Sequence, residues 1–275
     1  MAFSLARKQF EQSVKWSNSQ IDLAKAALYM AQEEYSEIEP DHYIALLDKM
    51  AAAIKAKLPE EFYPLRIIHC INDYLYEELG FSGNQADYYN PDNSYLNRVL
   101  DQHTGIPITL SLVYLEIARR LDFPMVGINM PGHFLIRPDV GEMDLFVDPF
   151  NQGEVLFQQD CDERLTQLFG KPTELKPEFF EPISSRMFLA RMLRNLKVIY
   201  LQRDDWERAL AAVDRIVLLV PDALMEQRDR GLIYYQVGEW PEARHDLNHY
   251  LDCHPNAEDA HMIGKILDQI NRRFP

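Results

Sequence analysis

Hydrophobic residues recur at helical spacing through roughly the first third of the chain. In residues 20–57 they predict two helices, separated by a break at Pro40 and Asp41. A third helix is predicted over residues 65–81, with Gly80 as its C-cap. A short fourth helix follows, with Asn93 and Ser94 at its N-cap. The inward positions of the first three helices are Ile21, Ala24, Leu28, Ala31, Leu46, Leu47, Met50, Ile54, Ile67, Ile68, Ile71, Leu75 and Leu79.

The next helix is predicted to begin after Gly105 and to lie at the centre of the domain. Pro107 falls in its first turn, where a missing N–H costs nothing. Apolar residues surround most of this helix, so we expect it to be largely buried. The side chains expected to face solvent are Thr109, Glu116, Arg119 and Arg120.

Three short β-rich segments follow the central helix, at residues 125–130, 133–138 and 144–149. Residues 138–144 are predicted to form a turn between the last two. Because helices come first and the strands are adjacent in sequence, the pattern favours an α+β fold with an antiparallel sheet. Residues 151–189 contain three dispersed prolines and are expected to form a connector that packs on the domain.

The C-terminal part repeats with a period of 34 residues, which is typical of tetratricopeptide repeats. Gly231 occupies a position where such a repeat has glycine, whereas the preceding repeat has Lys197 there. Two repeats and a final helix are predicted, and so short an array is expected to depend on the main domain for stability. The pairs at this spacing are Tyr200 and Tyr234, Trp206 and Trp240, Ala209 and Ala243, and Pro221 and Pro255.

Charge and composition exclude several classes of function. The net charge is −15, of which the first 189 residues carry −13. Such an acidic domain lacks the basic footprint of a nucleic-acid binder and would be repelled by anionic lipid. The three cysteines have no CxxC spacing, so neither disulfides nor a zinc site are predicted. Without a signal-like N-terminus or a long apolar run, the chain is predicted to be soluble and cytoplasmic.

His133 and Asp148 are the candidate catalytic residues, because adjacent antiparallel strands can bring them face to face. Asp148 would then fix the tautomer of a His133 base. A hydrogen bond that only closes the sheet edge is the structural alternative.

Ser111 and Cys70 are the candidate nucleophiles, and each also has a structural interpretation. Ser111 lies one turn along the central helix, where a small residue also permits close packing, and Cys70 lies within an apolar helix, as inert buried cysteines do.

No metal or cofactor site is predicted. His245 and His249 are four residues apart on a helix, but a third ligand is not evident. The acidic residues between Asp87 and Asp92 lack the glycine and closing glutamate of a calcium loop.

Four motifs, followed by the 34-residue repeats, resemble the bacterial SirB-type family. The motifs are DYYNPDNSYLNRVL, GIPITLSLVYLEIARRL, PGHFLIRP and FVDPFNQG. The resemblance covers nearly the whole chain. It implies a papain- or transglutaminase-like core over residues 1–185, in which helices pack on an antiparallel sheet, and an all-α tetratricopeptide tail over residues 186–275.

The resemblance also assigns site residues. His133 and Asp148 match the catalytic-type His and Asp. Active members have Gly-x-Cys at the start of the central helix and Arg-x-Leu-Gly about 12 residues later; here Arg119, Leu121 and Asp122 stand in the later positions. Pro107 therefore stands where the nucleophilic cysteine would be, and proline cannot attack. Related domains also resemble part of a eukaryotic F-box protein, which favours protein recognition in quality control.

Three functional hypotheses remain. The leading one is a non-catalytic adaptor that retains a degenerate cleft around Pro107, Ser111, His133 and Asp148. Its repeats would bind a protein or peptide. The alternative is a hydrolase, peptidase or acyltransferase that uses Ser111 or Cys70 with His133 and Asp148. In the third, the His–Asp pair is purely structural. The repeat residues expected either to line the groove or to support it are Tyr200, Trp206, Tyr234 and Trp240.

Overall fold

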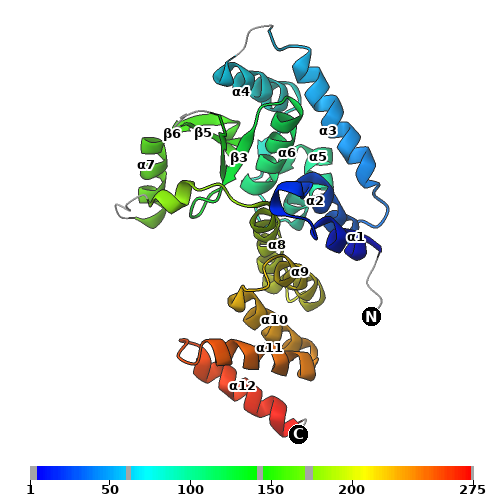
Figure 1. The fold of residues 1–275 in the computed structure, drawn as a ribbon, viewed down its shortest axis with the longest axis vertical. Coiled ribbons are helices and arrows are strands. Elements are labelled where there is room, and N and C mark those ends of the chain that lie inside the picture. The colour runs from blue at the N-terminus through cyan, green and yellow to red at the C-terminus, as the bar shows by residue number, and fades with distance from the viewer. Residues whose placement is uncertain (1–4, 60–62, 141–144, 171–175, 274–275) are drawn as a thin grey trace. The chain divides into compact units, whose positions relative to one another are not determined.

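A computed structural model describes residues 5–59, 63–140, 145–170 and 176–273 (Figure 1). The chain divides into two compact units, Met1–Phe188 and Leu189–Pro275. The division falls within helix α8 (Ser185–Gln202), three residues beyond the expected boundary at 185/186. The first unit contains both helices and antiparallel strands, and the elements described in the second unit are helices. This confirms the predicted α+β fold with a helical tail.

The first unit begins with helix α1, which the apolar spacing did not predict, and continues with α2 and α3, which it did. Asp22 caps α2 by accepting a hydrogen bond from the Lys25 N–H at 2.9 Å. In α3 the first residue is Pro40, where a proline interrupts no helical hydrogen bond. The helices before the central one are α1 (Leu5–Ser13), α2 (Leu23–Gln32), α3 (Pro40–Lys55), α4 (Pro64–Asn72) and α5 (Leu96–Gln102).

The sequence pattern predicts one regular helix as far as Gly80, but α4 ends earlier, at Asn72. It widens into a π-helical turn at Asp73–Glu78, and Gly80 then adopts a φ of +73°, which suits the expected glycine cap. Insertion of a π-turn rotates the side chains that follow it and is frequent near functional sites. Here the Tyr76 hydroxyl, within this turn, donates to the Pro149 carbonyl at 3.1 Å.

Two expectations for polar residues near the central helix are wrong. Asn93 and Ser94 do not cap α5; they are buried in a 3₁₀ turn, Pro91–Ser94, and Tyr95 is the N-cap residue. Thr109 is buried instead of solvated, because its hydroxyl donates to the Asn93 carbonyl at 2.7 Å. These hydrogen bonds tie the polar loop to the start of α6 (Pro107–Arg120).

Glu116 is also buried instead of solvated, with 4% of its surface exposed. The guanidinium groups of Arg119 and Arg120 both bind its carboxylate, and this pairing makes the burial of a charge tolerable. Amphipathic periodicity could not reveal this, since polar residues on a buried helix face depend on partners that only the fold supplies.

The four-stranded sheet is antiparallel with the order β3–β4–β5–β6. Its strands are Met125–Ile128, Leu135–Pro138, Leu145–Asp148 and Glu154–Phe157. Ile136 pairs with Val147, and this register brings the start of β4 towards the end of β5. Part of the expected turn, residues 141–144, lies outside the described residues. Strand β6 and helix α7 (Gln158–Phe169) occupy a region that we expected to be a connector, so that expectation is wrong.

The second unit contains helices α9 (Trp206–Leu219), α10 (Leu224–Val237), α11 (Trp240–Cys253) and α12 (Ala260–Arg273), in addition to most of α8. Gly231 lies where a Cβ atom would approach Leu247 to 2.9 Å, so glycine permits α10 and α11 to pack closely. At the equivalent position of the first repeat, Lys197 is buried. Its ammonium group lies 2.6 Å from carboxylate oxygens of Glu226 and Asp229.

Candidate functional site

His133 and Asp148 come together as the spacing predicts. His133 Nε2 lies 2.8 Å from Asp148 Oδ2. Asp148 is the last residue of β5, whereas His133 lies in the turn just before β4 and not within that strand. Gly132 precedes it with a φ of +74°, a conformation that glycine adopts at little cost. This turn sets the imidazole against the end of β5.

Asp148 is fully buried and accepts hydrogen bonds from several directions. The amide of Asn151 donates to Oδ2 at 2.8 Å, and the guanidinium of Arg164 binds the same oxygen. The backbone N–H groups of Phe150 and Asn151 lie 3.1 and 3.3 Å from Oδ1. Burial opposes ionisation, but the hydrogen bonds from His133, Asn151 and Arg164 outweigh it, so the pKa of Asp148 lies below its usual value.

Arg164 is a member of this site that the sequence did not suggest. It projects from α7 and binds both Asp148 and, at 2.6 Å, the Glu154 carboxylate on β6. Burial disfavours its charge, but the bonds to Asp148 and Glu154 prevail and raise the pKa of Arg164. The apolar spacing of residues 158–169 was the signal that could have revealed α7. Even so, the pairing across elements follows only from the fold.

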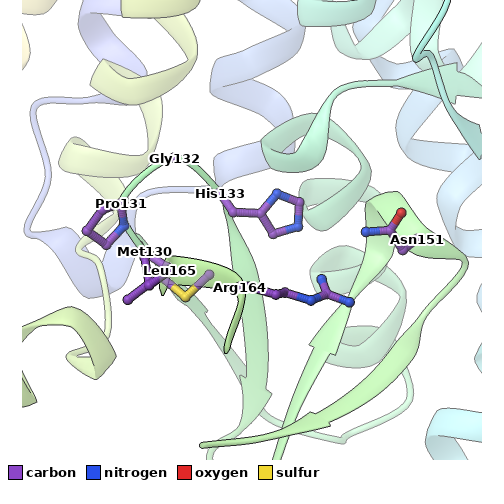
Figure 2. Close-up of a pocket in the computed structure, with 7 residues that line it drawn as sticks. All are labelled: Met130, Pro131, Gly132, His133, Asn151, Arg164 and Leu165. Atoms are coloured by element: carbon purple, nitrogen blue, oxygen red, sulfur yellow. The ribbon is translucent and has the colours of Figure 1, made fainter. Parts of the chain in front are cut away.

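A pocket of about 440 Å³ opens beside the His–Asp pair. Figure 2 shows that His133, Asn151 and Arg164 point towards one common space, with Met130 and Leu165 at its apolar side. Pocket volumes of this order suit a small ligand or a side chain of a partner. The lining residues are Met130, Pro131, Gly132, His133, Asn151, Arg164 and Leu165.

The candidate nucleophiles do not line this pocket, and none of them bonds to His133. Pro107 is buried as the first residue of α6. Ser111 is completely buried, and its hydroxyl has no hydrogen-bond partner within the described part of the chain. Cys70 is buried in α4. Among the described residues, Asp148 alone forms a hydrogen bond with the His133 ring, through Nε2. No hydroxyl or thiol of these residues is therefore hydrogen-bonded to Nδ1.

Cys161 is a further buried cysteine, in α7. Burial raises the pKa of its thiol to about 11, so it stays protonated near neutral pH. It packs with Leu156 and Leu165 in the core beneath the sheet. Its role there is that of a small apolar residue.

Aromatic residues flank His133 and were not anticipated. The Phe150 ring lies 6.2 Å from the His133 ring in an edge-on arrangement, and Tyr88 lies 6.1 Å from Phe150. Gly83 permits this contact, because a Cβ atom there would approach the Phe150 ring to 2.6 Å. The polar loop before α5 and the turn after β5 therefore meet beside the imidazole.

The four expected groove residues lie near helix ends in the second unit. Tyr200 is buried near the end of α8, and Trp206 is half-buried at the start of α9. Tyr234 and Trp240 are half-buried at the corresponding places in α10 and α11. Their shared placement follows the 34-residue period, and their part in binding stays a prediction.

Two further observations concern metals and membranes. Across the described ranges, His, Cys, Asp and Glu side chains form no group of three suited to a metal ion. The helices in that same part of the chain include none that is both long and apolar enough to cross a bilayer.

Comparisons with known proteins agree with the two-part architecture. The family model described as Transglutaminase-like superfamily matches residues 41–194, and one described as Tetratricopeptide repeat matches residues 196–268. No solved structure matches.

Two bacterial relatives match over nearly the full length of the chain. A UPF0162 protein of Xylella fastidiosa (strain 9a5c) is 36% identical over 92% of each chain, and one of Pseudomonas aeruginosa is 30% identical over 90% of each. Human F-box only protein 21 is 30% identical over 76% of this chain and 36% of its own length. The chain therefore belongs to the UPF0162, or SirB-type, family, as a transglutaminase-like domain followed by tetratricopeptide repeats.

Proposed function

We propose that this protein is a non-catalytic adaptor that binds protein or peptide partners through its repeats, and that its transglutaminase-like core has lost the nucleophile. The observation that carries the proposal is the environment of His133. Among described residues its ring bonds to Asp148 and to no hydroxyl or thiol, while a buried proline, Pro107, begins α6. Nucleophilic catalysis requires a base within hydrogen-bond reach of the attacking group.

Interaction through the repeats is supported by their surface as well as by their class. Stacked helical repeats present extended surfaces that bind other proteins. Helices α8 and α10, which are the first helices of the two repeats, and the final helix α12 each expose a large apolar side chain. These are Val198 on α8 at 43%, Met225 on α10 at 52% and Met262 on α12 at 47%.

The alternative hydrolase or acyltransferase has one observation in its favour. Asp148 is held ionised against Nε2 of His133, which leaves Nδ1 able to act as a base. Ser111 or Cys70 would have to reach that nitrogen. Because both are buried in helices, this requires a rearrangement of the region around α6.

The test is capture of partners from a native lysate by the full-length protein. Wild type is compared with His133→Ala and with the double variant Met225→Gln/Met262→Gln. Exposed Leu218, changed to Gln, serves as a matched control outside those three helices. The proposal predicts a stoichiometric protein partner that His133→Ala and Leu218→Gln retain and the double variant loses. A partner lost only with His133→Ala would contradict it.

A further inference from the structure

The four-stranded sheet has one covered edge and one open edge. At β3, Pro182 pairs with Ile128, and the Ile183 N–H donates to the Gly127 carbonyl at 2.9 Å. Strand β6 forms the opposite edge, and among the described residues it pairs with β5 alone. Both β6 and the helix after it, α7, are labelled in Figure 1. Proteins usually cover or blunt such an edge, because its unpaired backbone groups can bind another strand.

Val155 supplies the unpaired backbone groups of this edge. The Phe157 N–H donates to the Asp160 carboxylate at 2.7 Å and is therefore not bonded to β5. Residues of an antiparallel pair alternate between bonded and non-bonded positions. Val155, two residues earlier, therefore also turns its N–H and C=O away from β5. Outside the sheet, no described residue is hydrogen-bonded to the Val155 backbone.

A hollow of about 290 Å³ lies beside β6. Its walls come from β6 and from the first half of α7, which covers one face of the sheet through the contact of Cys161 and Leu165 with Leu156. A chain that paired with β6 would therefore enter a surface that is already concave. The lining residues are Glu154, Val155, Leu156, Asp160, Glu163 and Arg164.

The hollow is acidic. Three carboxylates line it, those of Glu154, Asp160 and Glu163. Glu163 is exposed and has no ion-pair partner in the part of the chain that the structure describes. Arg164 also lines the hollow, but its guanidinium already binds the carboxylates of Asp148 and Glu154. The edge therefore attracts a cationic partner and repels an anionic one.

The alternation of side chains along β6 separates two kinds of contact. Leu156 and Glu154 point towards α7, where Glu154 binds Arg164. Val155 and Phe157 point to the opposite face, and Phe157 is 61% exposed. A strand added beside β6 would place every second side chain near the acidic hollow and the others near Phe157. Complementarity therefore favours a segment in which basic and apolar residues alternate.

We propose that β6 binds an extended segment of a partner protein by strand addition, and that basic and apolar residues alternate in this segment. The backbone groups of Val155 pair with the added strand, the carboxylates attract its basic side chains, and Phe157 contacts its apolar ones. A second copy of this chain fits less well, because the same carboxylates would then face each other. The inference does not depend on the repeats or on the adaptor proposal.

The experiment is a titration of the ¹⁵N-labelled full chain with acetyl-Lys-Val-Lys-Val-Lys-Val-amide, monitored by amide chemical shifts. The same peptide with Glu in place of Lys is the matched charge control. We expect the Lys peptide to shift the Val155 amide signal and to slow the hydrogen exchange of that amide. The Glu peptide should bind at least about fivefold more weakly. Shifts that are equal for both peptides, or confined to other regions, would overturn the proposal.

Two N-methylated forms of the Lys peptide test the backbone pairing. One carries methyl groups on its Lys amides and the other on its Val amides, so their composition and charge are the same. Successive N–H groups of a strand point to opposite edges, so only one form keeps the N–H groups that face β6. Unequal affinities of the two forms support strand addition, whereas equal affinities would refute it.

Variants locate the site. Glu163→Lys should weaken the Lys peptide by about fivefold or more, and Asp252→Lys, the matched change at an exposed site of the second unit, should leave its affinity unchanged. Phe157→Ser should also weaken it. Met225→Gln/Met262→Gln should bind it as wild type does, which separates this edge from the repeats. Equal affinities for all variants, or a dimer of the free protein that Phe157→Ser abolishes, would contradict the proposal.

Discussion

Replacement of Asp148 by asparagine tests how the candidate site is held together. In the folded protein, Oδ2 of Asp148 accepts hydrogen bonds from the side chains of His133, Asn151 and Arg164. Its Oδ1 accepts hydrogen bonds from two backbone N–H groups. An asparagine oxygen can keep the backbone bonds, but its NH₂ group would then face Asn151 and Arg164, which are both donors. His133 can adapt by changing its tautomer.

The magnitude follows from these lost bonds. Hydrogen bonds to charged groups contribute about 1.5–3 kcal/mol each, and removal of one partner from a buried pair costs about 3–5 kcal/mol. Arg164 is 27% exposed and keeps Glu154, which relieves part of its penalty. We therefore expect Asp148→Asn to lower the free energy of unfolding of the first unit by about 3 kcal/mol.

The pH dependence has a definite sign. The pKa of Asp148 is lowered in the folded protein, so its carboxylate contributes stability at pH values above the unfolded pKa of about 3.9. That contribution disappears as the pH falls through the folded pKa. The difference in stability between wild type and Asp148→Asn should therefore be constant from about pH 5 to 7 and shrink below about pH 4.

The assay is urea denaturation in which unfolding is monitored by the hydrogen exchange of peptides from residues 145–165. These peptides report on the first unit alone. Asp252→Asn, an exposed site in the second unit, is the control and should change stability by less than about 0.5 kcal/mol. A loss below about 1 kcal/mol for Asp148→Asn, or a difference that persists unchanged at pH 3, would refute the account of this network.

Three further substitutions test individual contacts. Gly153→Ala should destabilise the first unit by about 2–4 kcal/mol in urea unfolding, because φ is +71° and a Cβ atom would lie 2.1 Å from Asn72 Oδ1; a neutral result would contradict this packing. Tyr76→Phe removes the hydrogen bond to the Pro149 carbonyl and should cost about 1 kcal/mol, with faster hydrogen exchange in the turn after β5. Lys197→Met leaves the buried Glu226 and the half-buried Asp229 with fewer partners, and we expect it to lower the melting temperature of the second unit through a loss of about 2–3 kcal/mol. Unchanged melting would show that the ion pairs contribute nothing net.

The sequence predicted those parts of the fold that depend on local periodicity. Helices α2, α3 and α6 and the 34-residue repeat all follow from apolar spacing, and the separation of His133 from Asp148 suits neighbouring strands. Strand β6 was missed because four residues, Glu154–Phe157, give too short an alternation to stand out from a proline-containing region.

The rest of the candidate site depends on contacts between distant segments. Arg164 and Asn151 join Asp148 only because α7 and the turn after β5 converge there, and nothing in their local sequence specifies that partner. Thr109 and Glu116 look solvated by periodicity but are buried, because the Asn93 carbonyl and two arginines satisfy them. Polar pairing of this kind is a tertiary property.

The most direct test of the central claim is acylation of the protein by an activated ester. Wild type and His133→Ala are incubated with p-nitrophenyl acetate, and adducts are measured by intact mass and assigned by peptide mapping. The proposed function predicts no adduct that depends on His133, because it takes Pro107 to stand in place of the nucleophile. An adduct on Ser111 or Cys70 that forms in wild type and disappears in His133→Ala would contradict it and identify the protein as an enzyme.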